Sequence, residues 1–192
     1  MKQLMVLMFL FLTSLVNAQD KTNLKDIDKL TFFGVDFSMA KVYGADETTE
    51  QFKDAFYGIN TLFQREPKKY DTAKAFDAAV TTDLETSQNL IEQIKKADLF
   101  TSDDSYQLIG DEIAEHIRQF NTGNAQGYGA VFIAGLLNKG KTQATYNVVV
   151  FDIATKDIIF NRQFTEKARG FGLRNYWAYP VYKILNKVKK IK

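Results

Sequence analysis

The sequence predicts an α/β sandwich: a mixed sheet that ends in an antiparallel three-strand meander, with helices packed mainly on one face. Three observations support it: an alternating segment at residues 30–43, three apolar segments within residues 128–167, and amphipathic helical segments around them. Alternation is typical of strands with one buried face, and apolar residues three or four apart are typical of helices. Elements in this order pack as two layers around one core.

The first strand is expected over residues 30–43. Phe33, Val35 and Phe37 occupy alternate positions, so we expect all three on one buried face. Asp36 then lies on the opposite face, where a carboxylate must be solvated or paired.

A helix is expected from Thr48 to about Arg65. Thr48 and Gln51 form the pattern of a capping box, in which each side chain bonds the backbone N–H of the other residue. The apolar residues that follow share one helical face: Phe52, Phe56, Ile59 and Phe63. Pro67 ends the helix because it lacks a backbone N–H.

The middle of the chain, residues 66–105, has weaker patterns. We expect a strand at residues 79–84 and a helix at residues 86–97. Asp111 is expected to cap a further helix. The buried stripe of that helix consists of Ile113, Ile117 and Phe120.

The three strands of the meander are expected at residues 128–137, 143–153 and 157–167. The run at residues 148–151 is apolar on both faces, which predicts a strand inside the sheet. A helix at residues 175–190 closes the chain. Pro180 is compatible with this helix only if the helix begins close before it, where N–H groups have no helical partner.

Residues 135–142 match the P-loop pattern G-x-x-x-x-G-K-[ST] at every position. A P-loop requires a helix after it, because the helix N-terminus holds the phosphates. Only residues 143–147 separate Thr142 from the valine run, whereas a crossover helix with its turns needs about 10 residues. We therefore predict a β-hairpin in whose turn Gly140 is free to adopt a positive φ, and no bound nucleotide.

Residues 1–18 have the pattern of a cleaved signal peptide. Lys2 precedes an apolar run, and Val16 and Ala18 fit the small-residue positions of a signal-peptidase site. The run is shorter than the ~20 residues that span a bilayer. We expect an exported protein, periplasmic or secreted, whose residues 19–192 form a single domain without a transmembrane span. The sequence contains no cysteine, so we expect neither lipoprotein processing nor disulfides.

The formal net charge of the chain is +2, so no nucleic-acid partner is expected. His116 is the only histidine, and Glu112 lies four residues before it on the same helical face. One histidine, one carboxylate and no cysteine are too few for a closed zinc site, so no metal or cofactor is expected. We expect His116 to be a partly buried structural residue. No G-x-S-x-G nucleophile pattern is present, so no catalytic residue is assigned.

Two groups of residues are candidates for contact with a ligand or partner. Asp36 and Ser38 place a carboxylate and a hydroxyl on one strand face, for which solvation or a salt bridge is the alternative explanation. The second group surrounds the Gly-Phe-Gly turn at residues 170–172: Arg169, Arg174, Asn175, Tyr176 and Tyr179. Arginines and free helix N–H groups suit an anion, and exposed aromatic residues suit a protein interface.

The sequence Gly-Ala-Val-Phe-Ile-Ala at residues 129–134, the hairpin sequence at residues 146–160 and the closing helix resemble a recurrent exported α/β unit. They are similar to the TolB amino-terminal domain and to the CsgG-like envelope proteins of curli secretion, with residues 33–38 as the first strand. Residues 170–177 resemble small uncharacterised exported bacterial proteins. The resemblance implies a binding or assembly role and carries over no catalytic residue.

We therefore expect an exported, non-enzymatic binding or assembly module of the bacterial cell envelope, with a protein or envelope component as its partner. Two alternatives stay open. One is a hydrolase that uses Asp36, Ser38 or His116, which requires these residues to converge. The other is a protein that binds a small ligand between the sheet and the helices.

Overall fold

The computed structural model describes residues 23–190. The helices are η1 (Leu24–Asp26), α1 (Thr49–Arg65), α2 (Thr72–Phe76), α3 (Glu85–Glu92), α4 (Lys96–Leu99), α5 (Gly110–Gln119) and α6 (Leu173–Val188). The strands are β1 (Lys29–Asp36), β2 (Lys41–Tyr43), β3 (Ala79–Thr82), β4 (Tyr128–Asn138), β5 (Gln143–Asp152) and β6 (Ile158–Lys167). The predicted signal peptide lies outside the described residues and stays a prediction.

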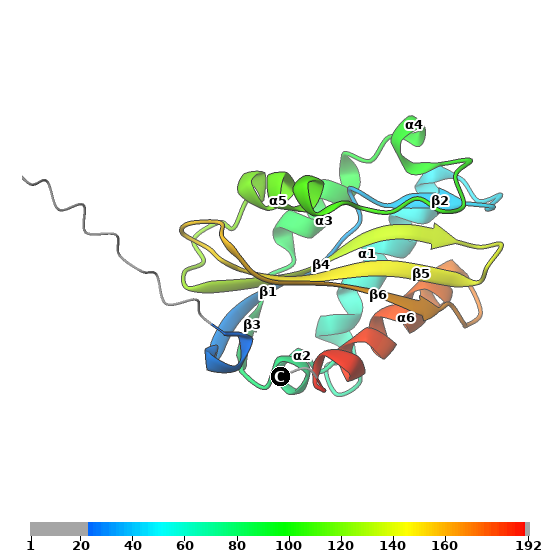
Figure 1. Ribbon diagram of the computed structural model, residues 1–192. Helices are drawn as coiled ribbons and strands as arrows, with labels where there is room; N and C mark the ends of the chain where they lie inside the picture. The colour runs from blue at the N-terminus through cyan, green and yellow to red at the C-terminus, as the bar shows by residue number, and fades with distance from the viewer. Residues whose placement is uncertain (1–22, 191–192) are drawn as a thin grey trace, which may run out of the picture.

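The strands of residues 23–190 form one mixed sheet with the order β3-β1-β4-β5-β6 (Figure 1). β1 is parallel to β3 and β4, whereas β4, β5 and β6 are successively antiparallel. β2 pairs with β4 beyond the end of β1. The predicted mixed sheet with a C-terminal meander is confirmed, and β5 lies inside the sheet as its apolar run predicted.

Helices cover the two faces of the sheet unequally (Figure 1). α1, α2 and α6 contribute to the larger hydrophobic cluster, which contains Phe32 and Val148 of the sheet. α5 lies on the opposite face and packs Ile113 and Ile117 into a second cluster with Phe33. The prediction of helices mainly on one face is confirmed, and α5 covers part of the other face.

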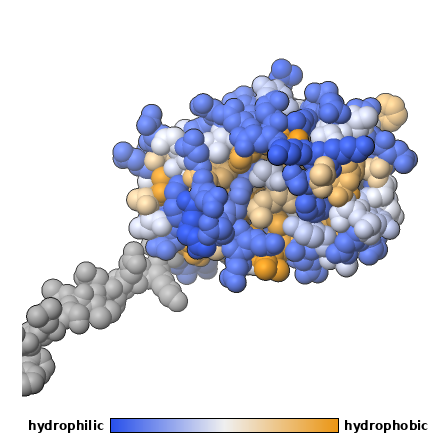
Figure 2. Space-filling model, turned by 90° about the horizontal axis from the view of Figure 1, so that it is seen from above, coloured by the Kyte–Doolittle hydropathy of each residue, from blue (hydrophilic) through white to orange (hydrophobic). Residues whose placement is uncertain are grey.

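The surface of the molecule is mostly hydrophilic when it is seen from the α5 side, and apolar residues show only in small areas between polar ones (Figure 2). Within residues 23–190, none of the helices combines the length and the apolar character that a bilayer crossing requires.

The segment that matches the P-loop pattern forms a hairpin. A turn at residues 139–142 joins β4 to β5, so the residues that directly follow the pattern, 143–152, form a strand and not a helix. The predicted hairpin is therefore confirmed. Gly140 does not use its freedom to adopt a positive φ; Thr142, the last residue of the turn, adopts one instead (φ 50°). Lys141, the lysine of the pattern, forms an ion pair with Asp104 (2.7 Å).

The first predicted strand, residues 30–43, is divided into β1 and β2. A turn follows β1, and the Ala40 N–H donates to the Phe37 carbonyl within it (3.0 Å). Asp36 Oδ1 also accepts the backbone N–H of Ser38 (2.8 Å). Such a local side-chain bond competes with strand pairing, so the prediction of one continuous strand is wrong.

A bulge at Gly34 changes which side chains of β1 share a face. Gly34 has a φ of 83°, and the pairing of β1 with β4 shifts between Phe32 and Val35. Phe33 consequently faces α5 while Val35 faces the larger cluster, so their expected common face is wrong. Asn60 of α1 bonds the Val35 backbone at the bulge: its Oδ1 accepts the N–H (2.7 Å) and its Nδ2 donates to the carbonyl (2.9 Å).

The closing helix begins at Leu173 rather than Asn175, so Pro180 lies in its interior. The expectation that this proline is close to the helix start is wrong. Pro180 removes the N–H that would bond the Tyr176 carbonyl, and the Arg169 N–H donates to that carbonyl instead (3.3 Å). The chain segment between β6 and α6 thus replaces the missing helical bond.

Candidate functional site

The predicted contact residues lie in two separate places. Asp36 and Ser38 lie at and just after the end of β1, where Asp36 meets α5. The other five lie on the segment before α6 and on the first half of that helix: Arg169, Arg174, Asn175, Tyr176 and Tyr179. Since α5 and α6 cover opposite faces of the sheet (Figure 1), the two groups do not form one site.

Asp36 forms a contact with His116 across 80 positions of sequence. Asp36 Oδ2 lies 2.5 Å from His116 Nε2, and the Asp36 side chain is fully buried whereas that of His116 is 18% exposed. A buried carboxylate needs a hydrogen-bond donor, because loss of its hydration costs several kcal/mol. Of the two structural explanations for Asp36, pairing is confirmed and solvation is wrong, because α5 covers this face.

The apolar stripe of α5 directs His116 toward the sheet. Ile113 and Ile117 are buried, and the His116 ring packs edge-on against Phe120, with 6.0 Å between ring centroids. The expected partly buried histidine is therefore confirmed. Its ring connects α5 to the end of β1.

The Ser38 hydroxyl is not part of this contact. Its oxygen is buried and makes no hydrogen bond to any described residue. A serine nucleophile must lie within hydrogen-bond reach of its base. Asp36 and His116 therefore lie close together, as a hydrolase would require, but the Ser38 hydroxyl does not join them.

At the start of α6, Phe171 is 96% exposed, more than any other large apolar residue among the described part of the chain. It lies between Gly170 and Gly172, whose φ values of 138° and 78° are rare for residues with a side chain. A Cβ on Gly170 would lie 2.9 Å from the Asn175 backbone. The glycines thus permit the backbone turn that leaves Phe171 outside the core.

A pocket of 450 Å³ lies between the start of α6 and the segment that joins α1 to α2. Four of the five predicted residues of this region line it: Arg169, Arg174, Asn175 and Tyr179. The remaining lining residues are Glu66, Lys69, Tyr70, Gly170, Phe171 and Tyr182. We call this the α6 pocket.

Arg174 lies against α1 because Gly58 has no side chain. A Cβ built on Gly58 would lie 2.8 Å from Arg174 Cδ. The guanidinium donates to Asn175 Oδ1 from Nε (3.1 Å) and Nη2 (2.9 Å), and Asn175 Nδ2 donates to the Phe171 carbonyl (3.1 Å). Arg174 is therefore positioned without a carboxylate partner among residues 23–190.

Tyrosine rings form the floor of the α6 pocket. Tyr70 is 3% exposed, and its ring meets that of Tyr182 edge-on, with 6.2 Å between centroids. Lys69 Nζ lies 5.2 Å from the centroid of Tyr70 and 5.9 Å from that of Tyr182. Burial, with a smaller contribution from Glu66, raises the pKa of Tyr70 to about 12, so its hydroxyl stays neutral at physiological pH.

Tyr176 is the predicted residue of this region that does not line the pocket. Its ring packs edge-on against Trp177, with 4.8 Å between centroids. Burial raises the pKa of Tyr176, and the charges of Lys139 and Glu47 act on it as well. Tyr176 therefore belongs to the side of α6 that faces the β4–β5 turn.

The sequence did not indicate Lys69 and Tyr70 as site residues. Their only local signal is their position just after Pro67, the residue that ends α1. Their place in the pocket depends on how the α1–α2 segment packs against α6. Across residues 23–190, no group of three His, Cys, Asp or Glu side chains is arranged to hold a metal ion.

Neither a protein-family model nor a curated protein matches this chain. Among solved structures, the C-terminal domain of LpoB from Salmonella enterica matches with a TM-score of 0.32 and 12% sequence identity. The match covers 73% of this chain and 82% of that chain. At this TM-score the match carries no function over to the present protein, and LpoB is neither of the proteins that the sequence pattern resembles.

Proposed function

We propose that this protein is an exported, non-enzymatic binding module of the bacterial cell envelope and that the α6 pocket is its contact site for a protein partner. The observation that supports this most is Phe171, which is 96% exposed at the edge of the pocket. Aromatic residues contribute strongly to the binding energy of protein interfaces because each buries a large apolar area, and arginine is enriched among the residues that contribute most.

The pocket is also organised in advance of binding. Arg174 donates two hydrogen bonds to Asn175 and lies against α1 at Gly58. A side chain that is already positioned loses less conformational entropy when a partner binds. This is the arrangement expected of a contact surface rather than of a residue exposed by chance.

The test is capture of a partner from an envelope extract of the source cells by the immobilised mature protein. Phe171→Ser and Arg174→Ala are expected to lose the partner, because each removes a side chain of the contact site without opening the core. Ile109→Ser and Arg118→Ala are matched controls on the α5 side, where Ile109 is 58% exposed, and they should retain it. The proposal is contradicted if all four variants capture the same protein equally, or if neither the variants nor the wild type capture any protein. Circular dichroism checks that each variant is folded.

Export rests on the pattern of residues 1–18 and has its own test. Cell fractionation followed by N-terminal sequencing should find the protein outside the cytoplasm with Gln19 as its first residue. Uncleaved protein in the cytoplasm would contradict export while leaving the binding experiment valid.

Hydrolysis is a second candidate function, and one observation favours it: the 2.5 Å contact between Asp36 and His116. A carboxylate that orients a histidine is part of the machinery of many hydrolases. The unbonded Ser38 hydroxyl argues against it. Hydrolysis of an activated ester that is lost in His116→Ala and in Ser38→Ala would establish this function, and no hydrolysis by the wild type would exclude it for such substrates.

A further inference from the structure

The α6 pocket continues into a second pocket of 390 Å³, because Lys69 and Tyr182 line both. The other lining residues of the second pocket are Lys68, Asp71, Lys74, Ala75, Leu185, Asn186 and Lys189. The two pockets follow one boundary, between α6 on one side and the α1–α2 segment with α2 on the other. We call them together the α6 groove.

One side of the α6 groove is a single stripe along the helix. The stripe residues are Asn175, Tyr179, Tyr182, Asn186 and Lys189. They are spaced alternately four and three positions apart, which places them on one helical face. At about 1.5 Å per residue this stripe is about 21 Å long, which matches about six residues of extended chain at about 3.3 Å each.

The groove concentrates positive charge. Its basic residues are Lys68, Lys69, Lys74, Arg169, Arg174 and Lys189, and its acidic residues are Glu66 and Asp71. Both acids are already engaged: Glu66 pairs with Lys69 (3.4 Å), and Asp71 caps α2 by accepting the Lys74 N–H (2.9 Å). Six basic and two acidic side chains give the groove a net charge of +4, which exceeds the +2 of the whole chain.

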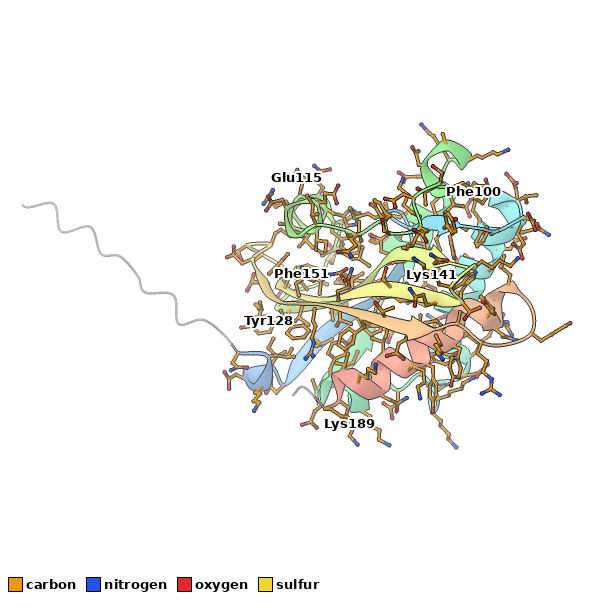
Figure 3. The ribbon with its side chains drawn as sticks, turned by 45° about the vertical axis from the view of Figure 1, so that its right-hand side comes forward. Phe100, Glu115, Tyr128, Lys141, Phe151 and Lys189 are labelled. Carbon is orange, nitrogen blue, oxygen red and sulfur yellow. The ribbon has the colours of Figure 1, made fainter. Side chains whose placement is uncertain are left out.

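The basic side chains other than Lys69 form no ion pair with any described residue, yet they surround a floor of tyrosine rings. We propose that the α6 groove binds an extended acidic segment of the partner protein, with a carboxylate against each end and an apolar or aromatic side chain on the tyrosines. This inference rests on the proposed function and specifies the chemistry of the partner. Lys189, at the end of the groove, lies on the far side of the sheet from Glu115 of α5 (Figure 3).

A peptide fits the groove better than a phosphate polymer or a lipid surface. Asn186 Nδ2 donates to the Tyr182 carbonyl (2.9 Å), so the amide oxygen of Asn186 remains an acceptor for the N–H of a bound chain. A phosphate polymer has no N–H group to offer. The pockets are concave between α6 and the α1–α2 segment, whereas a bilayer needs a surface that can lie flat against headgroups.

The test measures binding of a fluorescent peptide of about eight residues, rich in glutamate with one central phenylalanine, long enough to fill the groove. The glutamine version of this peptide, inorganic polyphosphate and phosphatidylglycerol vesicles are compared with it. The acidic peptide is expected to bind, and its affinity should fall between about 0.05 M and about 0.5 M salt because the groove charges are exposed to screening. Lys74→Gln/Lys189→Gln is expected to weaken binding about tenfold. Lys95→Gln/Arg118→Gln removes the same charge elsewhere and should leave binding unchanged.

Absence of peptide binding, equal binding of the glutamine peptide, or equal loss in both double variants overturns this inference. Binding of polyphosphate or vesicles without the peptide overturns it in favour of an anionic polymer or a membrane. The proposed function is judged separately. If Phe171→Ser and Arg174→Ala lose the captured partner while the peptide fails, only the acidic-segment inference is wrong.

Discussion

The Asp36–His116 contact and the α6 groove differ in how far their polar groups are satisfied within the chain. Asp36 is fully buried, and its two oxygens interact with His116 and with the Ser38 N–H. The basic residues of the groove are exposed, and most have no carboxylate partner among residues 23–190. Buried polar groups are generally satisfied because leaving them unpaired is costly, whereas unpaired surface charge is available to a partner. The Asp36–His116 contact is therefore explained by its role in the stability of the fold, whereas the unpaired charges of the groove are explained by binding of a partner.

The aromatic residues divide in the same way. Phe33 and Phe120 pack edge-on in the cluster under α5, with 5.5 Å between their centroids. In the groove, Phe171 is exposed, while Tyr179 and Tyr182 are half-buried at the surface. The comparison teaches that the best candidates for a functional role in this molecule are side chains that the fold positions at the surface without using them to stabilise the core.

The largest effect is expected at the buried contact. His116→Ala leaves the Asp36 carboxylate buried without its partner, so it should lower the free energy of unfolding by about 3 kcal/mol. Asp36→Asn/His116→Ala, which has no buried charge, should be destabilised less than the single variant. Urea denaturation measures both. A loss below about 0.5 kcal/mol, the usual range for surface substitutions such as Arg118→Ala, would mean that the contact is not structural.

The second prediction concerns the bulge that directs Asp36 toward α5. Asn60→Ala leaves the N–H and the carbonyl of Val35 without their buried partners, so we expect a loss of about 2 kcal/mol. Gln64→Ala, an exposed position on the same helix, is the control and should change stability by less than about 0.5 kcal/mol. Equal effects of the two substitutions in urea denaturation would show that Asn60 does not hold the bulge.

The third prediction separates stability from binding at the groove. Gly58→Ala should stabilise α1 by up to about 1 kcal/mol, because the new methyl group meets a movable arginine side chain rather than backbone. It should also displace Arg174 and weaken partner capture. The melting temperature and the capture experiment measure the two effects. Higher stability with unchanged capture would show that the position of Arg174 does not matter for binding.

The smallest effect is expected for an ion pair that lies outside both regions. The hydrogen bond from Lys139 lowers the pKa of Glu47, so the pair stabilises the fold above the unfolded-state pKa near 4.5, and this stabilisation is lost as pH falls through the lower folded-state pKa. Since Lys139 is 35% exposed and Glu47 26%, screening limits the effect of Lys139→Met to under about 1 kcal/mol at neutral pH.

The measurement is urea denaturation of Lys139→Met and wild type at about pH 7 and about pH 2, well below the ordinary pKa of a glutamate. The difference between the two proteins should be present at neutral pH and absent in acid. A difference that persists unchanged in acid would show that Lys139 contributes through packing rather than through charge.

Several elements were predictable from sequence because neighbouring residues determine them. The capping box of Thr48 and Gln51 predicted the start of α1, and both of its bonds are present. The short distance from Thr142 to the valine run predicted a hairpin in place of a P-loop. The Gly-Phe-Gly turn at residues 170–172 indicated a candidate contact region, and four of the five residues predicted around it line one pocket.

The tertiary structure alone decided the rest, because those features depend on contacts between distant segments. One extra residue at Gly34 reversed the face of Phe33, which no alternation pattern reveals. Asp36 and His116 are 80 positions apart, and only the packing of α5 against the sheet brings them together. The wall of the groove opposite α6 likewise exists only because the α1–α2 segment packs there. Local patterns thus determine which elements form, while burial and packing determine which side chains are left for a partner.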